Sequence, residues 1–274
     1  MAGQLLAVAF LILLAGFPFH IWLQPVVSVG RPLTLVLVLG LGQILLLVFV
    51  YEWLAAYPWI HTAVPFRRLI QWSSGLTALT AGVLAVTMPS LRRLLGSLLL
   101  LDMSVSLAML LVPVETGWET AVLLPLVRSV SLLLVVLGKY GLPAADQTAA
   151  AWRGSGRQRP IAALTLGYGL FSLLGLPLGV GFPGRWSAIV LIAAADVSFW
   201  LPVGLLLATG GGIYGLWRGL SPLLMRGEKD AAVRQPIVDQ VGLLLGLAAG
   251  VVLAVTPLGL SFIQRLALLW LRAG

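Results

Sequence analysis

The sequence predicts an all-α fold, a polytopic membrane helix bundle with about eight transmembrane helices, one or two of which are broken. Sixty per cent of the 274 residues are hydrophobic and only 9% are charged. The mean hydropathy is +1.05. These values lie outside the range of soluble domains. Apolar runs of about 20 residues, the length that one crossing needs, recur along the chain. We therefore interpret residues 1–274 as a single membrane domain.

The composition also excludes several kinds of site. The chain has no cysteine, which rules out disulfides, thiolate metal sites and cysteine nucleophiles. Its two histidines, His20 and His61, argue against a histidine metal or haem site. No nucleotide-binding or metal-ligand spacing is present. We therefore expect no catalytic residue, cofactor or metal. The net charge of +8 favours loops that face an anionic lipid surface over nucleic-acid binding.

The first apolar run, residues 3–23, contains a helix interruption. Pro18 removes an amide donor and clashes with the preceding turn. In lipid, such a break needs protein or water around it. Because His20 and Trp22 follow, this layout predicts a broken helix beside a polar cavity. No basic segment or cleavage site of a secretory signal surrounds the run, so we interpret it as retained.

Seven further apolar runs complete the predicted bundle. The longest of them is crowded with glycine and proline, including Pro202 and Gly210, so we expect a half-helix followed by a full span there. Beyond the last run, residues 261–272 form a weakly amphipathic tail that we expect to lie along the interface. The seven runs are 33–53, 71–88, 94–113, 120–141, 161–180, 186–217 and 238–257.

The positive charges predict the orientation of the bundle. Eight spans place alternate loops on opposite faces, and most of the 17 lysines and arginines then fall on one face. That face is expected to be cytoplasmic, which leaves both termini on the outer face. Arg185 counts among the few cations of the outer loops in this scheme. The two longest polar segments, 143–160 and 218–236, become cytoplasmic loops. A solvated basic loop is favoured for both over a partner contact.

Four motifs resemble one known family. Residues 17–24 read Phe-Pro-Phe-His-Ile-Trp-Leu-Gln, which is similar to the Phe-Pro-x-His-x-Trp-Leu-Pro signature of antiporter-like, proton-translocating membrane subunits. Such subunits occur in complex I (NADH–quinone oxidoreductase), related hydrogenases and Mrp antiporters. Three later motifs of the family are resembled in the same order by residues 77–85 with 90–97, by 172–177 with 181–186, and by 256–259. The resemblance implies helices seven to fourteen of a fourteen-helix chain, hence a half-length antiporter-like module.

The resemblance also implies a row of ionisable side chains along the membrane midplane. Two lysine positions of the family fall on Leu13 and near Gln43, neither of which titrates. What remains as a proton path is His20, Gln43, Asp102 and Arg185. For His20 a structural role is favoured, either as a cap of the broken helix or as a hydrogen-bond partner of a carbonyl freed by Pro18.

Two further buried charges, Arg128 and Asp196, have no role that the resemblance explains. An aspartate–arginine set inside the bilayer can transfer protons or can join helices as a static pair. The static pair is favoured because arginine holds its proton.

These observations lead to a hypothesis about function. The chain is expected to be a multi-pass protein of the bacterial cytoplasmic (inner) membrane and a subunit of a complex I-like assembly. It would contribute to or support proton or cation translocation coupled to redox chemistry elsewhere, with other membrane subunits and the lipid bilayer as partners. Such a chain is not an enzyme by itself. The alternatives are a stand-alone small permease and a purely structural membrane spacer.

Overall fold

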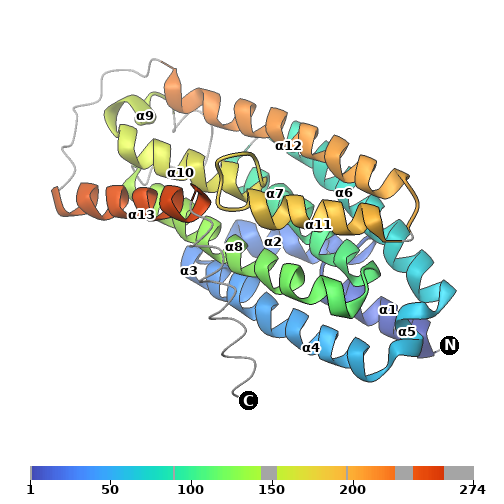
Figure 1. The fold of residues 1–274 in the computed structure, drawn as a ribbon. Helices are drawn as coiled ribbons and strands as arrows, with labels where there is room; N and C mark the ends of the chain where they lie inside the picture. The colour runs from blue at the N-terminus through green and yellow to red at the C-terminus, as the bar shows by residue number, and fades with distance from the viewer. Residues whose placement is uncertain (1, 89, 143–152, 196, 226–236, 256–274) are drawn as a thin grey trace.

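The structure is a computed structural model that describes residues 2–88, 90–142, 153–195, 197–225 and 237–255. All regular elements in these ranges are helical (Figure 1). In chain order they are α1 (Ala2–Leu13), the 3-10 helix η1 (Phe19–Trp22), α2 (Leu23–Val29), α3 (Pro32–Leu35), the π-helix η2 (Val36–Leu41), α4 (Gly42–Ala56), α5 (Pro58–Thr62), α6 (Val64–Thr87), α7 (Leu91–Ala108), the 3-10 helix η3 (Met109–Leu111), α8 (Val114–Gly141), α9 (Ser155–Gln158), α10 (Pro160–Leu173), α11 (Phe182–Ala194), α12 (Trp200–Leu224) and α13 (Ile237–Val255).

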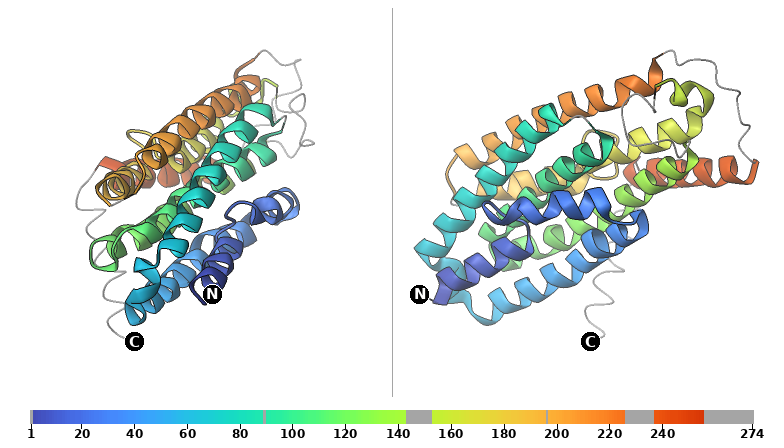
Figure 2. Two further views of the ribbon diagram at one scale, coloured as in Figure 1. Left: turned by 90° about the vertical axis from the view of Figure 1, so that its right-hand side faces the viewer. Right: turned by 180° about the vertical axis from the view of Figure 1, so that it is seen from behind.

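Helix α7 lies at the centre of the bundle. The segment Leu91–Leu111 is apolar on all sides apart from a few polar residues, and 94% of its hydrophobic window is buried. A helix that is hydrophobic all round needs neighbours on every face. Helices α2, α6, α8 and α12 supply them, while α8 also packs along α10 and α6 along α12. The axes of the long helices are roughly aligned with one another (Figure 2).

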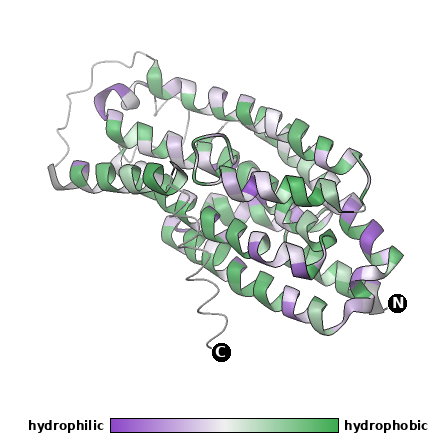
Figure 3. Cartoon of the chain, viewed as in Figure 1, coloured by the Kyte–Doolittle hydropathy of each residue, from purple (hydrophilic) through white to green (hydrophobic). Residues whose placement is uncertain are grey.

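The outward faces of the bundle are strongly apolar. Five segments are long and apolar enough to cross a membrane: Pro32–Ala56, Val64–Thr87, Leu91–Leu111, Val114–Gly141 and Trp200–Leu224. Exposed side chains along them include Leu45, Phe49, Leu207 and Trp217. Hydrophobic residues recur along all the long helices, and strongly hydrophilic residues are few (Figure 3). Because water would disfavour such surfaces, they are suited to contact lipid. The predicted membrane bundle is confirmed.

Two crossings are interrupted, and one of the two breaks lies where it was expected. The first break separates α1 from η1 and α2 at residues 14–18, where the sequence placed it. The second separates α10 from α11 at residues 174–181, so the expectation of one continuous span at 161–180 is wrong. Glycine and proline at 175, 177, 179 and 181 explain this break. Because α10 and α11 are each shorter than the ~20 residues of one crossing, they complete one only together.

This second break corrects the predicted boundaries around it. The expected run 186–217 is split into the half-helix α11 and the full span α12. The split lies between Ala194 and Trp200, whereas Pro202 and Gly210, which suggested it, lie inside the continuous helix α12. Arg185, which the orientation argument placed in an outer loop, lies instead in the first turn of α11 and is only 3% exposed.

The two expected polar loops contain helix. Residues 218–224 continue α12, and α9 lies within 143–160. The Gly154 amide donates to the Pro222 carbonyl at 3.0 Å, so the two segments meet at one end of the bundle, opposite the N-terminus (Figure 1). Residues 143–152, 226–236, the tail 261–272 and Asp196 lie outside the described residues.

Candidate functional site

A buried ion pair joins the two central helices, α7 and α8. Arg128 of α8 donates from Nε to the Asp102 carboxylate of α7. Its Nη2 donates to the Ser106 hydroxyl at 2.7 Å, and its Nη1 to the Leu39 carbonyl at 3.4 Å. Arg128 is 2% exposed and Asp102 is 6% exposed. Every guanidinium nitrogen therefore has an acceptor, which a buried arginine requires.

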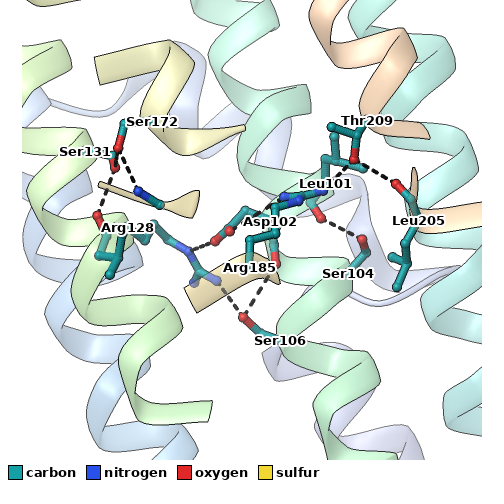
Figure 4. A network of polar contacts seen from close by, with 12 residues as sticks. Leu101, Asp102, Ser104, Ser106, Arg128, Ser131, Ser172, Arg185, Leu205 and Thr209 are labelled. Carbon is teal, nitrogen blue, oxygen red and sulfur yellow. Dashed lines mark hydrogen bonds and ion pairs between the residues drawn. The ribbon is translucent and has the colours of Figure 1, made fainter. Parts of the chain in front are cut away.

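Arg185 completes the cluster from the second broken helix. Its Nη1 lies 3.9 Å from Asp102 Oδ1, and its Nη2 donates to the Thr209 hydroxyl of α12 at 3.0 Å. Its Nε is buried without a hydrogen-bond partner among the described residues. Figure 4 shows Asp102 between the two arginines. We call Asp102, Arg128 and Arg185 the ion cluster.

Two serine hydroxyls hold the second break beside the ion cluster. Ser131 of α8 and Ser172 of α10 lie 2.8 Å apart at their Oγ atoms (Figure 4). The Gly181 amide, just before α11, donates to Ser172 Oγ at 3.1 Å. A single hydroxyl therefore links both sides of the break to α8, which fixes the position from which Arg185 extends.

A π-helical turn supplies another contact to the ion cluster. In η2 the usual i→i−4 ladder is interrupted, which frees a carbonyl for a side-chain donor. The Leu39 carbonyl accepts such a bond from Arg128. Gly40 allows this approach, because a Cβ there would lie 2.4 Å from Ser129 Oγ of α8.

Side chains of α6 and α4 form hydrogen bonds with backbone groups around the first break. The Phe17 amide donates to Thr77 Oγ1 at 2.7 Å, and the Ser73 hydroxyl donates to the Phe17 carbonyl at 2.5 Å. Gln43 donates from Nε2 to the Leu13 carbonyl at 3.5 Å. These bonds replace the helical hydrogen bonds that Pro18 prevents.

His20 does not take the capping role expected of it. Its ring stacks on Phe17 at a centroid distance of 5.6 Å, and its Nδ1 is buried without a partner in the described part of the chain. Ser73 and Thr77 bond the backbone of Phe17 at the break instead. No local feature of the sequence indicates this exchange, because α6 reaches the break only through folding.

The structure thus brings some predicted residues together and separates others. Asp102 and Arg185 meet in the ion cluster, and Arg128, whose role was open, becomes the direct partner of Asp102. His20 and Gln43 belong to the first break, and among the described residues no hydrogen bond or ion pair joins them to the ion cluster. Ser106 and Thr209 were missed. Ser106 lies four residues after Asp102 on the same helix face, a spacing that could have indicated it.

The chemistry open to this cluster is narrow. One carboxylate faces two guanidinium groups, so the cluster carries a net charge of about +1 when Asp102 is ionised. Arginine holds its proton, which leaves Asp102 as the group of the cluster that can exchange one. Within the described ranges, no group of three or more potential metal-ligating residues occurs. The arrangement is suited to moving or locking charge inside the bilayer.

Comparison with known proteins places the chain in a family. The family described as NADH:quinone oxidoreductase/Mrp antiporter, TM matches residues 1–210. The chain belongs to this family. NADH-quinone oxidoreductase subunit N of Chromohalobacter salexigens is 28% identical over 260 residues, which are 88% of this chain and 52% of that protein. Subunit N 1 of Solidesulfovibrio magneticus is 30% identical over 238 residues, 82% of this chain and 49% of that protein. The chain therefore spans about half the length of these curated relatives.

Solved structures show the same fold. A chain of the archaeal membrane-bound sulfane sulfur reductase matches with a TM-score of 0.78 at 16% identity, over 97% of this chain and 54% of that one. A chain of respiratory complex I from Thermus thermophilus matches with a TM-score of 0.68 at 22% identity, over 95% and 56%. The antiporter-like fold expected from the four motifs is confirmed for this family member.

Proposed function

We propose that this family member is a membrane subunit of a complex I-like assembly, in which it contributes to or supports proton or cation translocation driven by redox chemistry in other subunits. The family match and the two broken helices support this role. The observation that carries it is the ion cluster, where an acid on α7 meets a cation from the second break. Titratable charges inside the hydrocarbon region are costly and are typical of ion pathways.

Within this proposal, Asp102 is the residue that exchanges a proton. Protonation of Asp102 would leave Arg128 and Arg185 facing each other without a counter-charge. The protonated state becomes accessible when Arg185 moves away from Arg128. Arg185 lies in the first turn of α11, directly after the second break, so a shift of α11 would move it. Proton uptake at Asp102 would therefore be coupled to a displacement of α11 relative to α7.

A structural spacer is the second candidate function. Arg128 has acceptors for all three of its nitrogens, from α7 and from η2. This is the arrangement of a static pair that joins helices. Under this alternative the ion cluster fixes helix packing, and translocation occurs in other subunits.

The first experiment is purification of the tagged chain in mild detergent, with mass spectrometry of the proteins that accompany it. Antiporter-like, quinone-site or hydrogenase-like subunits in stoichiometric amounts are expected. A chain that emerges alone and transports ions in isolation would contradict the proposal and favour a permease.

The second experiment measures proton pumping of the assembled complex in membrane vesicles. Asp102→Asn is expected to reduce pumping while electron transfer continues. Glu115→Gln, at an exposed carboxylate at the start of α8, is the matched control and should leave pumping unchanged. Unchanged pumping in an assembled Asp102→Asn complex would favour the spacer.

A further inference from the structure

A wide apolar groove lies on the surface of the bundle, and no residue of the ion cluster lines it. It runs between α9, α10, α12 and α13 and encloses about 760 Å³. Small and large residues alternate along the α10 wall, and leucines form the α12 wall. The groove is lined by Gly156, Ala163, Gly167, Phe171, Leu220 and Leu224, among others, and none of its lining residues is acidic.

The length of the groove matches one leaflet of a bilayer. Its lining follows α10 from Pro160 to Phe171, a rise of roughly 16 Å at about 1.5 Å per residue. Half of the hydrocarbon core is about 15 Å. The groove then ends at Leu178 inside the second break. These dimensions are those of a single acyl chain that enters from one face of the membrane.

Positive charge lies at the outer end of the groove. Arg157 is exposed and directly follows the lining residue Gly156. Arg153 is also exposed, and its neighbour Gly154 donates to the Pro222 carbonyl, next to the lining residue Leu223. Arg157 donates from Nε to the carbonyl of the lining residue Leu224 at 2.9 Å, which holds its guanidinium at the groove entrance. Its two terminal nitrogens make no hydrogen bond to any described residue. They are therefore free to donate to an anion, and a planar guanidinium is suited to bind phosphate in a bidentate way.

We propose that this groove binds an anionic glycerophospholipid, with one acyl chain along α10 and the phosphate at Arg153 and Arg157. The leaflet-length apolar wall accounts for the chain, and the arginine pair at its entrance accounts for the headgroup. Basic sites near helix ends on a cytoplasmic face select anionic lipids by the same electrostatics. The site lies outside the ion cluster, so this inference does not depend on the proposed translocation function.

The headgroup preference is tested in nanodiscs that contain phosphatidylcholine with a minor fraction of phosphatidylglycerol. Lipid retained after extraction is identified by native mass spectrometry. Phosphatidylglycerol is expected to be enriched on the order of tenfold over the bulk mixture. The double variant Arg153→Gln/Arg157→Gln should lose this enrichment. Arg93→Gln, at an exposed arginine of the same end of the bundle that does not line the groove, should keep it.

Occupancy of the groove is tested by filling it. A Cβ at Gly167 would meet only Leu220 Cδ1, at 3.5 Å, so Gly167→Leu can place its side chain in the groove without a backbone clash. This variant is expected to lose the retained lipid. Gly210→Leu on α12, where a Cβ would meet no atom within 4 Å, is the control and should retain it.

Two results would overturn the proposal. Equal retention of both lipids by the unmodified chain would show that the arginines do not select the headgroup. Absence of retained lipid, with Gly167→Leu behaving like the unmodified chain, would show that another protein segment fills the groove.

Discussion

At the scale of single residues, the geometry of the ion cluster depends on two glycines, Gly175 and Gly40. Gly175 has a φ of +64°, and a Cβ there would lie 2.3 Å from Arg185 Cδ. Only glycine combines this left-handed backbone with room for the passing arginine. Gly40 has the same role for the approach of η2 to α8. The charges are therefore positioned by glycines that carry no charge themselves.

Gly175→Ala is expected to lower the stability of the protein and to displace Arg185. The left-handed conformation alone costs an alanine about 1–2 kcal/mol, and the contact with Arg185 adds to this. Gly210→Ala, on an open helix face, is the matched control and should not destabilise the chain. Thermal unfolding in detergent measures the difference. Equal midpoints for the two variants would show that Arg185 does not need this space.

His61 lies in α5, at the end of the bundle that also holds the N-terminus (Figure 1). Its Nε2 lies 3.1 Å from the Val112 carbonyl, and Arg67 Nη1 donates to the Leu111 carbonyl at 3.3 Å. Both bonds satisfy carbonyls at the end of η3 that have no helical partner. Burial lowers the pKa of His61, and the nearby Arg67 charge lowers it further, while the Val112 bond and Glu115 act in the opposite direction.

A lowered histidine pKa predicts a loss of stability in acid. As the pH falls below about 6.5, the unfolded chain takes up a proton that the folded His61 resists, so unfolding becomes more favourable. His61→Gln keeps a donor for Val112 and should reduce the difference in unfolding midpoint between about pH 7.5 and about pH 5. His20 titrates in both proteins and cancels in the comparison. If the unmodified chain and His61→Gln show the same pH dependence of unfolding, His61 is not the source of the acid sensitivity.

At the scale of elements, each broken helix is held by hydroxyls from a neighbouring continuous helix. Ser73 and Thr77 of α6 bond the first break, and Ser131 of α8 contacts Ser172 at the second. A hydroxyl can both donate and accept, so a single serine or threonine serves two backbone or side-chain groups. The breaks are therefore tertiary features, although proline and glycine allow them locally.

Thr77→Val is expected to loosen the first break. Valine keeps the shape of threonine but leaves the Phe17 amide without its acceptor, at a cost of about 1–3 kcal/mol. Hydrogen exchange at residues 14–18 should become faster. Thr80→Val is the matched control, because the Thr80 hydroxyl bonds only carbonyls of its own helix. Unchanged exchange in Thr77→Val would mean that another group, such as water, satisfies Phe17.

At the scale of the whole molecule, the charges of the two ends differ. Arg92, Arg93, Arg153 and Arg157 gather at the end where α7 begins and α12 terminates. Glu115 and Glu119 are exposed at the opposite end, near the start of α8. The positive-inside rule therefore predicts that the arginine-rich end faces the cytoplasm.

Single-cysteine labelling tests this orientation, since the chain has no cysteine of its own. A membrane-impermeant maleimide added to intact spheroplasts should label Glu119→Cys. It should label Gln158→Cys on α9 only after the membrane is permeabilised. The reverse pattern would invert the predicted topology, and labelling of both positions before permeabilisation would contradict a fixed orientation.

The amino-acid sequence by itself determined the membrane bundle, the first break and the presence of buried charges at 102 and 128. Hydropathy and proline act through the local chain, so they can be evaluated without knowledge of the fold. The four motifs, read in order, also indicated the family.

Only the tertiary structure decided which charges meet. Whether Asp102 faces Arg128, Arg185 or His20 depends on how α7, α8 and α11 rotate and approach, and local sequence does not encode these angles. Local sequence also does not indicate that Arg128 bonds the Leu39 carbonyl, freed by a π-helical turn, or that Arg185 bonds Thr209. The boundary error at 161–180 has a related cause. A broken helix and a continuous span have nearly the same hydropathy, and the position of the break is decided by its packing against α8.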